Sequence, residues 1–213
     1  MKSAATCLHC TDCPRLAGFL ADVRRAHPDY HARPVVPFGD ARARLLIVGL
    51  APGMHGANRT GRPFTGDFAG ILLYDTLHRY GFASTATSVS TDDGLQLTDC
   101  RITNAVKCLP PANKPTPEEI RTCNRWLADE LAHSPDVRVI LALGQIAHQA
   151  VLRALGQRPS AHAFGHAACH VLDARRTLID SYHCSRYNTQ TRRLTERGFH
   201  DVFDMIRAQL DHA

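Results

Sequence analysis

A glycine-rich loop that follows a short apolar segment constrains the fold of this chain more than any other feature. Residues 44–48 read Arg-Leu-Leu-Ile-Val, an aliphatic run with the length and composition of a buried strand. Residues 49–67 then carry five glycines among polar side chains, and the apolar residues 71–77 predict a helix. Glycine lets the backbone turn sharply and lets another molecule approach main-chain N–H groups. The sequence therefore predicts a strand, a ligand-binding loop and a helix.

Strands and helices alternate along the rest of the chain. Three more strands are predicted, at residues 99–106, 137–144 and 177–182. Periodicity and capping signals predict further helices at residues 13–25, from Pro117 onward, at 145–155 and at 197–210. This alternation predicts an α/β fold of three layers, α/β/α, around a central, largely parallel four-stranded sheet. With no linker or repeat in its 213 residues, the chain is expected to form a single domain over residues 1–213.

Composition narrows the class of partner. The formal charge is +5, and arginine far outnumbers lysine, which occurs at Lys2, Lys107 and Lys114. Guanidinium groups suit phosphate, so a polyanionic partner is favoured, although a genome-wide preference for arginine would give the same composition. No run approaches the roughly 20 apolar residues of a membrane helix, and the N-terminus has no apolar signal segment. We therefore expect a cytoplasmic protein without a membrane partner, in which disulfides are rare.

The unusual residues converge at one edge of the predicted sheet. The glycine-rich loop, Asn104, Gly144 and His183 each lie near the carboxyl end of a predicted strand. In open parallel sheets this is the edge at which ligands bind. Phe64 lies within the polar loop, where a flat ring offers a surface on which a nucleic-acid base can stack.

The loop resembles the first motif of the family 5 uracil-DNA glycosylases. The shared segments are Gly-Leu-Ala-Pro at 49–52, Asn-Arg-Thr-Gly-Arg at 58–62 and Phe-Thr-Gly-Asp at 64–67. The resemblance covers nearly the whole chain apart from residues 84–97, which predict a surface loop or short hairpin. It implies a monomeric, monofunctional DNA glycosylase that hydrolyses the N-glycosidic bond of uracil in DNA and leaves an abasic site. It also implies activity on other deaminated bases, such as hypoxanthine and xanthine.

The resemblance assigns roles to individual residues. Asp67 would stabilise the sugar cation or position water, His183 would stabilise the departing base, and His55 would share that role. The implied substrate-binding residues are the stacking ring of Phe64, the base-reading amide of Asn104, and Gly49, Ala51, Gly53, Ser185 and Asn188. The implied DNA-binding residues are Arg59, Arg62, Lys114, Arg186 and Arg193. Three of these residues also have a purely structural interpretation. Asp67 would be a helix N-cap, Asn104 a polar residue at a strand end and His183 a structural histidine.

Four cysteines show a ligand-like pattern. Cys10 and Cys13 form a Cys-x-x-Cys pair, whereas Cys108 and Cys123 lie much later in the chain. Four thiolates can hold a zinc ion or a four-iron four-sulfur cluster. The third interpretation is that the four cysteines are unrelated buried thiols. The resemblance implies a structural 4Fe-4S cluster on these four residues, tying the N-terminal helix to the body of the protein. Cys7 is a near competitor for one ligand position.

The chain also departs from the family pattern. Leu50 and Gly53, as expected of family 5, stand where other branches of the superfamily carry an acidic or amide residue, so catalysis must depend on Asp67, on main-chain donors and on stabilisation of the leaving base. Two other positions differ from family 5 itself. Cys184 replaces the usual proline after His183, and Arg192 stands where glycine is common. Losing the proline frees a backbone dihedral angle of this loop. The alternative function is therefore a non-catalytic iron-sulfur protein that binds DNA or senses damage.

Overall fold

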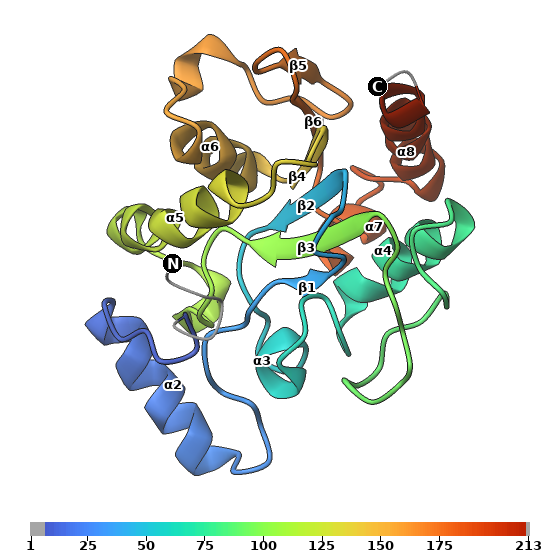
Figure 1. Cartoon of the computed structure of the whole chain (residues 1–213). Helices are drawn as coiled ribbons and strands as arrows, with labels where there is room; N and C mark the ends of the chain where they lie inside the picture. The colour runs from blue at the N-terminus through green and yellow to red at the C-terminus, as the bar shows by residue number, and fades with distance from the viewer. Residues whose placement is uncertain (1–6, 212–213) are drawn as a thin grey trace.

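A six-stranded mixed sheet forms the centre of the protein (Figure 1). The computed structural model describes residues 7–211, so both ends of the predicted domain lie outside the described residues. The strands are β1 (Phe38–Gly39), β2 (Leu45–Gly49), β3 (Cys100–Asn104), β4 (Val139–Leu143), β5 (Cys169–Val171) and β6 (Thr177–Ser181). Their order across the sheet is β1-β3-β2-β4-β6-β5. The four inner strands are parallel, and the two edge strands are antiparallel to their neighbours.

The predicted α/β class is confirmed, but the predicted number of strands is wrong. The four predicted strands form the parallel centre of the sheet, and β1 and β5 extend it on either side. These two strands are only two and three residues long. Segments this short carry no readable hydrophobic period, and neither is fully buried. The sheet is therefore mixed, with antiparallel edges around a parallel centre.

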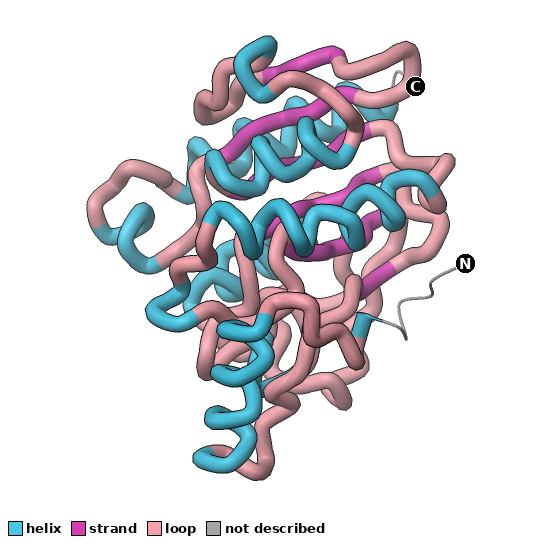
Figure 2. The backbone as a smooth tube through the Cα atoms, turned by 90° about the vertical axis from the view of Figure 1, so that its left-hand side faces the viewer, coloured by secondary structure: helices cyan, strands magenta, loops and turns pink. Residues whose placement is uncertain are grey.

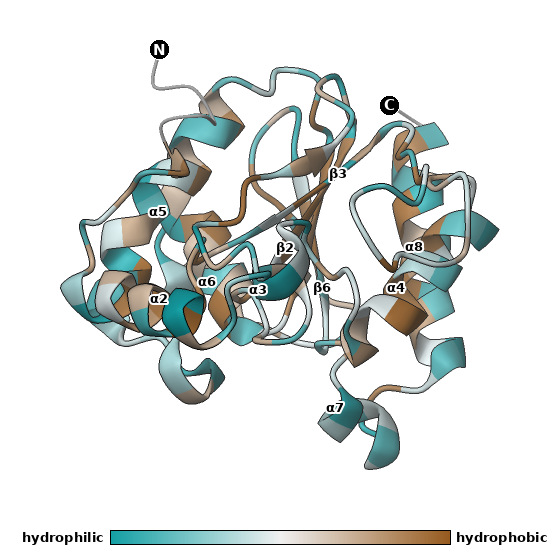
Figure 3. Ribbon diagram, turned by 90° about the horizontal axis from the view of Figure 1, so that it is seen from below, coloured by the Kyte–Doolittle hydropathy of each residue, from teal (hydrophilic) through white to brown (hydrophobic). Residues whose placement is uncertain are grey.

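Helices cover both faces of the sheet. Seen from below in Figure 3, α5 and α6 lie on one side of the strands and α4 and α8 on the other. The α-helices are α2 (Pro14–Ala26), α3 (Ala57–Thr60), α4 (Phe68–Arg79), α5 (Pro117–Ala132), α6 (Gln145–Ala154), α7 (Arg186–Gln190) and α8 (Glu196–Asp211), and the 3-10 helices are η1 (Pro111–Asn113) and η2 (Pro159–Ala161). None of the helices within residues 7–211 is long and apolar enough to cross a membrane.

Alternation along the strands explains these layers. Successive side chains of a strand point to opposite faces of the sheet. Leu45 and Ile47 therefore belong to one core, which includes the α8 residue Phe203. Leu46 and Val48 belong to a second core, built with α5 and α6. Because β2 is buried on both faces, its sequence is an uninterrupted apolar run.

The first helix packs at one end of this framework rather than on the sheet. Figure 2 shows α5 and α6 in front of the strands and running roughly along them, with α2 beyond them at one end of the molecule. Leu16 and Leu20 of α2 share a third core with Val106, Leu109 and Trp126. This core brings the N-terminal segment next to the loop after β3 and the start of α5.

The start of α5 links the two segments. The Glu119 amide donates to the Thr116 hydroxyl at 3.2 Å, and the Thr116 amide donates to the Glu119 carboxylate at 2.7 Å. This is the predicted capping box, which satisfies two amides at the helix start. The guanidinium of Arg15 on α2 donates two hydrogen bonds to the same carboxylate, at 2.7 and 2.8 Å.

Replacing Thr116 with alanine should lower the free energy of unfolding by ~1 kcal/mol, because one N-terminal amide loses its acceptor. Thr116→Ser should retain most of the stability, since serine supplies the same hydroxyl. Urea unfolding followed by circular dichroism measures both values. Equal destabilisation by the two substitutions would show that the hydroxyl is not the stabilising group.

Candidate active site

The loops after the parallel strands enclose a cavity at the predicted edge of the sheet. Its volume is about 340 Å³, within the range of small-molecule sites. Five segments of the chain supply its lining: Leu50, Ala51, Gly53 and Ala57; Phe64, Asp67 and Ala69; Asn104; Asn113; and His183 and Ser185. Segments far apart in the chain therefore meet at one site.

Asp67 both caps a helix and lines the cavity. Its side chain accepts a hydrogen bond from the Gly70 amide at 2.9 Å, which confirms the predicted N-cap of α4. The same side chain lines the cavity. Burial raises the pKa of Asp67, whereas the amides of Gly70 and Ala69 act against this rise. A Cβ atom on Gly56 would lie 2.4 Å from the second carboxylate oxygen, so only glycine leaves room for this placement.

Phe64 forms an apolar wall of the cavity. Its φ of 55° lies in the left-handed region, which costs a non-glycine residue roughly 1–2 kcal/mol. Its ring lies nearly parallel to that of His183, with centroids 5.8 Å apart and an interplanar angle of 29°. A Cβ atom on Gly70 would lie 1.9 Å from the Phe64 carbonyl oxygen, so close packing holds the strained loop in place. Strained backbone of this kind clusters at functional sites.

Asn104 ends β3 with a buried amide. Its side-chain oxygen has no hydrogen-bond partner within residues 7–211, although only 3% of the residue is exposed. Buried polar atoms are nearly always paired, so an unpaired one in a residue that lines a cavity points to a donor on a ligand. Gly49 lies directly behind it, because a Cβ atom there would be 2.4 Å from this oxygen and 2.6 Å from the Phe64 ring.

His183 follows β6 and is held by a short helix that the sequence did not predict. Burial lowers the pKa of His183 to about 4, so the ring is neutral at pH 7. The Asn188 side chain donates to the His183 carbonyl at 2.8 Å, and Ser185 caps α7 by accepting from the Asn188 amide. Cys184 is fully buried in the core. Ser185 and Asn188 therefore hold the loop that carries His183.

Other predicted site residues lie around the cavity rather than in it. His55 is exposed, and its Nδ1 is 2.9 Å from the Tyr30 hydroxyl; it is not among the lining residues. Asn188 lines a neighbouring cavity of about 490 Å³, which shares Leu50 and His183 with the first. Arg193 lines this second cavity, and its guanidinium lies 4.4 Å from the centre of the Tyr182 ring.

The predicted DNA contacts divide into exposed and buried residues. Arg59, Lys114, Arg186 and Arg193 are exposed. Arg62 is only 4% exposed, and its guanidinium forms an ion pair with Asp93 and donates to Ser88 and Thr65. The assignment of Arg62 to DNA is therefore corrected: it fastens the loop of residues 84–97 to the glycine-rich loop.

Sequence reasoning missed Asn113, a second amide in the cavity. Asn113 and the preceding Ala112 both have left-handed φ values, 57° and 54°. Asparagine tolerates this conformation but alanine does not favour it, so the sequence carried no local signal for the turn.

The predicted cysteine ligands line a separate enclosed cavity. Cys10, Cys13, Cys108 and Cys123 are joined there by Cys7, at the junction of α2 with the start of α5. The Lys107 amide donates to the Cys123 sulfur at 3.3 Å, and Arg125 donates to the Cys10 sulfur at 3.6 Å. Among residues 7–211, no three of these sulfurs lie within 4.8 Å of one another. Sulfur ligands of a single tetrahedral zinc ion would be about 3.8 Å apart.

Similarity to known proteins identifies the class of this chain. The model of the uracil DNA glycosylase superfamily matches residues 36–207. The chain is similar to the type-5 uracil-DNA glycosylase of Thermus thermophilus, with 52% identity over 198 residues that cover 91% of this chain and 90% of the relative. Type-5 enzymes of Mycobacterium bovis and Pyrobaculum aerophilum are 46% and 42% identical, over 91% and 92% of this chain and 75% and 86% of their own lengths.

The chain therefore belongs to the uracil DNA glycosylase superfamily, and its relatives place it in the type-5 family. This confirms the resemblance seen in the glycine-rich loop.

The His183 ring should titrate with a midpoint near pH 4 instead of the ordinary value of about 6.5, because burial disfavours its charged form. Folding stability should consequently fall as the pH drops from 6.5 toward 4, since the unfolded chain takes up the proton first. NMR titration of the histidine Cε1–Hε1 signals measures the midpoint, and His183→Gln identifies the signal. A midpoint at or above 6.5 would contradict the neutral ring.

Proposed function

We propose that this protein is a DNA repair glycosylase that hydrolyses the bond between uracil and deoxyribose and leaves an abasic site. The observation that carries the proposal is the cavity itself, which combines an aromatic wall, an unpaired buried amide oxygen and a carboxylate. Family membership supports the same activity.

Base recognition follows from two side chains. A base inside a duplex is inaccessible, so the nucleotide turns out of the stack into the cavity. Phe64 supplies the flat surface on which the base stacks. The Asn104 amide oxygen accepts from the uracil N–H, and its amide nitrogen donates to the neighbouring carbonyl oxygen. Hypoxanthine and xanthine present a similar N–H and carbonyl edge, so we include these deaminated bases among the substrates.

The remaining polar groups serve the bond-breaking step. The N1–C1′ bond breaks with its electron pair on uracil, and a water oxygen then bonds to C1′. Asp67 stabilises the positive charge that develops on the sugar and positions the water. Neutral His183 donates a hydrogen bond to the uracil anion as it leaves. Overall, one water molecule supplies the hydroxyl group on C1′ and the proton that uracil gains.

Exposed cations around the cavity would bind the DNA backbone. Lys114 follows Asn113 and Arg186 follows Ser185, so each adjoins a residue of the cavity lining. Arg59 lies two residues after Ala57, and Arg193 lines the neighbouring cavity. Such contacts would hold the flanking phosphates while the nucleotide is extruded.

Asp67→Asn should lower the rate of uracil release by roughly 100-fold or more, because the charge that stabilises the transition state is lost. Asparagine is an equally good N-cap, so stability should be nearly unchanged. Asp75→Asn, on the exposed face of the same helix, is the matched control and should retain full activity. Release is measured with matched oligonucleotides that carry uracil, hypoxanthine, xanthine or only normal bases, followed by alkaline cleavage.

The same assay distinguishes the alternative function. A protein that only binds or senses damage would release no base from any strand, although it would bind damaged DNA tightly. Unchanged release by Asp67→Asn would instead remove Asp67 from the mechanism.

We also propose that Cys10, Cys13, Cys108 and Cys123 hold a structural 4Fe-4S cluster. Four thiolates suit this cluster, and the spread of the sulfurs fits a polynuclear group better than a single zinc ion. The hydrogen bonds from Lys107 and Arg125 would offset the charge of the thiolates. When bound, the cluster would fix α2 against the start of α5 and has no part in bond breaking.

Cys123→Ser should lose the iron and acid-labile sulfide that the purified wild-type protein contains, because one of four ligands is removed. Cys100→Ser, which is equally buried but lies outside the cysteine cavity, should retain both. Cys7→Ser should also retain both, which separates the fifth cysteine from the four ligands. A wild-type protein without iron and sulfide, and with zinc bound through sulfur, would contradict the cluster.

A further inference from the structure

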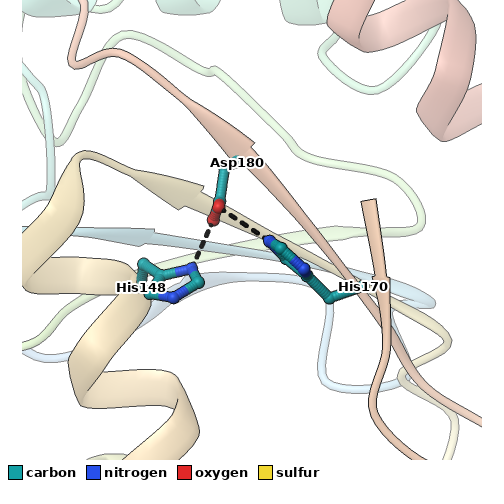
Figure 4. Close-up of side chains that lie close together, drawn as sticks. All are labelled: His148, His170 and Asp180. Atoms are coloured by element: carbon teal, nitrogen blue, oxygen red, sulfur yellow. Dashed lines mark hydrogen bonds and ion pairs between the residues drawn. The ribbon is translucent and has the colours of Figure 1, made fainter. Parts of the chain in front are cut away.

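A cluster of buried polar side chains lies outside both the base cavity, which Asp67 and Asn104 line, and the cysteine cavity, which Cys10 and Cys123 line. It comprises His148 on α6, His170 on β5 and Asp180 on β6 (Figure 4). The side chains of Asp180 and His148 are 0% and 1% exposed, and that of His170 is 13% exposed. None of the three has a role in the proposed glycosylase chemistry.

The three side chains meet with the spacing of metal ligands. Asp180 Oδ1 lies 2.8 Å from His148 Nδ1, and Asp180 Oδ2 lies 3.0 Å from His170 Nε2. The candidate ligand atoms of all three residues lie within 4.8 Å of one another. Ligand atoms around a tetrahedral zinc ion are about 3.3 Å apart, given zinc–nitrogen bonds of about 2.0–2.1 Å. The two separations between Asp180 and the histidines are thus within about 0.5 Å of the value that an ion requires.

The hydrogen bonds of His148 require a proton or a metal ion at this point. Its Nε2 lies 3.0 Å from the His162 carbonyl oxygen, which can only accept, so Nε2 carries a hydrogen. Its Nδ1 faces the Asp180 carboxylate, which is also an acceptor. Two lone pairs at this distance would repel each other. A proton or a metal ion must therefore lie between His148 Nδ1 and Asp180.

The buried carboxylate of Asp180 also needs a positive charge close to it. A carboxylate removed from water needs a compensating positive charge. Among the residues that the structure describes, His148 and His170 are its ion-pair partners, and no lysine or arginine reaches it. A divalent ion would supply this charge without requiring either imidazole to be charged.

Neighbouring groups already orient the ligands. Histidines that bind metal commonly donate their other ring N–H to a backbone carbonyl, as His148 does to His162. The Gly165 amide points toward Asp180 Oδ2 at 3.4 Å, and the Phe164 ring packs edge-on against His148. The centre of the His162 ring lies 5.3 Å from that of His170, so a third imidazole is close enough to serve as a further ligand.

We propose that His148, His170 and Asp180 bind a divalent transition-metal ion of the zinc class. Two imidazoles and one carboxylate are a donor set that such ions prefer, and a water molecule or His162 would complete the tetrahedron. The site joins α6, β5 and β6, so the ion would fasten the connection between α6 and β6 to the sheet. It is separate from the proposed cluster and from the proposed active site.

The proposal is tested by measuring zinc binding to the full chain. The protein is purified with its cysteine site occupied and is then treated with a chelator before zinc is added. Calorimetric titration should show one zinc ion per chain, and the thermal unfolding midpoint should rise with zinc concentration. X-ray absorption at the zinc edge should show nitrogen and oxygen ligands at about 2.0–2.1 Å and no sulfur at about 2.3 Å. Absent binding, or a sulfur shell, would overturn the site.

Matched variants locate the ion. His170→Gln removes one ligand and keeps the His148–Asp180 pair, so zinc affinity should fall at least 10-fold while base release is unchanged. His133→Gln, on the exposed end of α5, and Cys169→Ser, the exposed neighbour of His170, should bind zinc as the wild type does. Equal zinc affinity in His170→Gln would overturn the proposal. So would an NMR signal showing that His148 Nδ1 keeps its proton in excess zinc.

Discussion

The hydrogen bond that the Gly70 amide donates to Asp67 fixes a carboxylate of the cavity to the start of a helix. One carboxylate oxygen caps α4, a helix that packs against the sheet, and the side chain also lines the base cavity. The orientation of the carboxylate is thus set by a helix terminus rather than by a flexible loop. Gly56 and Gly70 leave room for this arrangement, because a Cβ atom at either position would overlap Asp67 or the Phe64 carbonyl. The position of Asp67, the proposed catalytic group, therefore depends on the same packing as the core.

The parallel centre of the sheet was predictable from the sequence because its strands are buried on both faces. The residues of β2 and β4 form unbroken apolar runs, Leu45–Gly49 and Val139–Leu143, that differ plainly from the amphipathic helices between the strands. The edge strands β1 and β5 were not predictable, since their two or three residues are defined by pairing with a neighbour. The short helix α7 depends similarly on the Ser185 cap and on the contact between Asn188 and His183.

The candidate site was predictable where local sequence and position agree. Phe64, Asp67, Asn104 and His183 follow strands or belong to a long motif, and the structure brings them to one cavity. Arg62 was misassigned because its burial depends on Asp93, 31 residues away. Other features depend wholly on tertiary structure. The turn at Asn113 lacks a glycine, and the histidine and aspartate ligands of the proposed zinc site come from three elements that no spacing rule connects.

The cysteine cavity has a consequence for the order of events during synthesis. Its walls come from residues 7–17 and from residues 107–126, so more than half of the 213 residues must leave the ribosome before the cavity can close. Until then, the N-terminal thiols have no partner segment and remain open to solvent and oxidants. Loading of the proposed cluster would therefore have to wait until α2 can pack against α5, a junction that the ion pair between Arg15 and Glu119 helps to hold together.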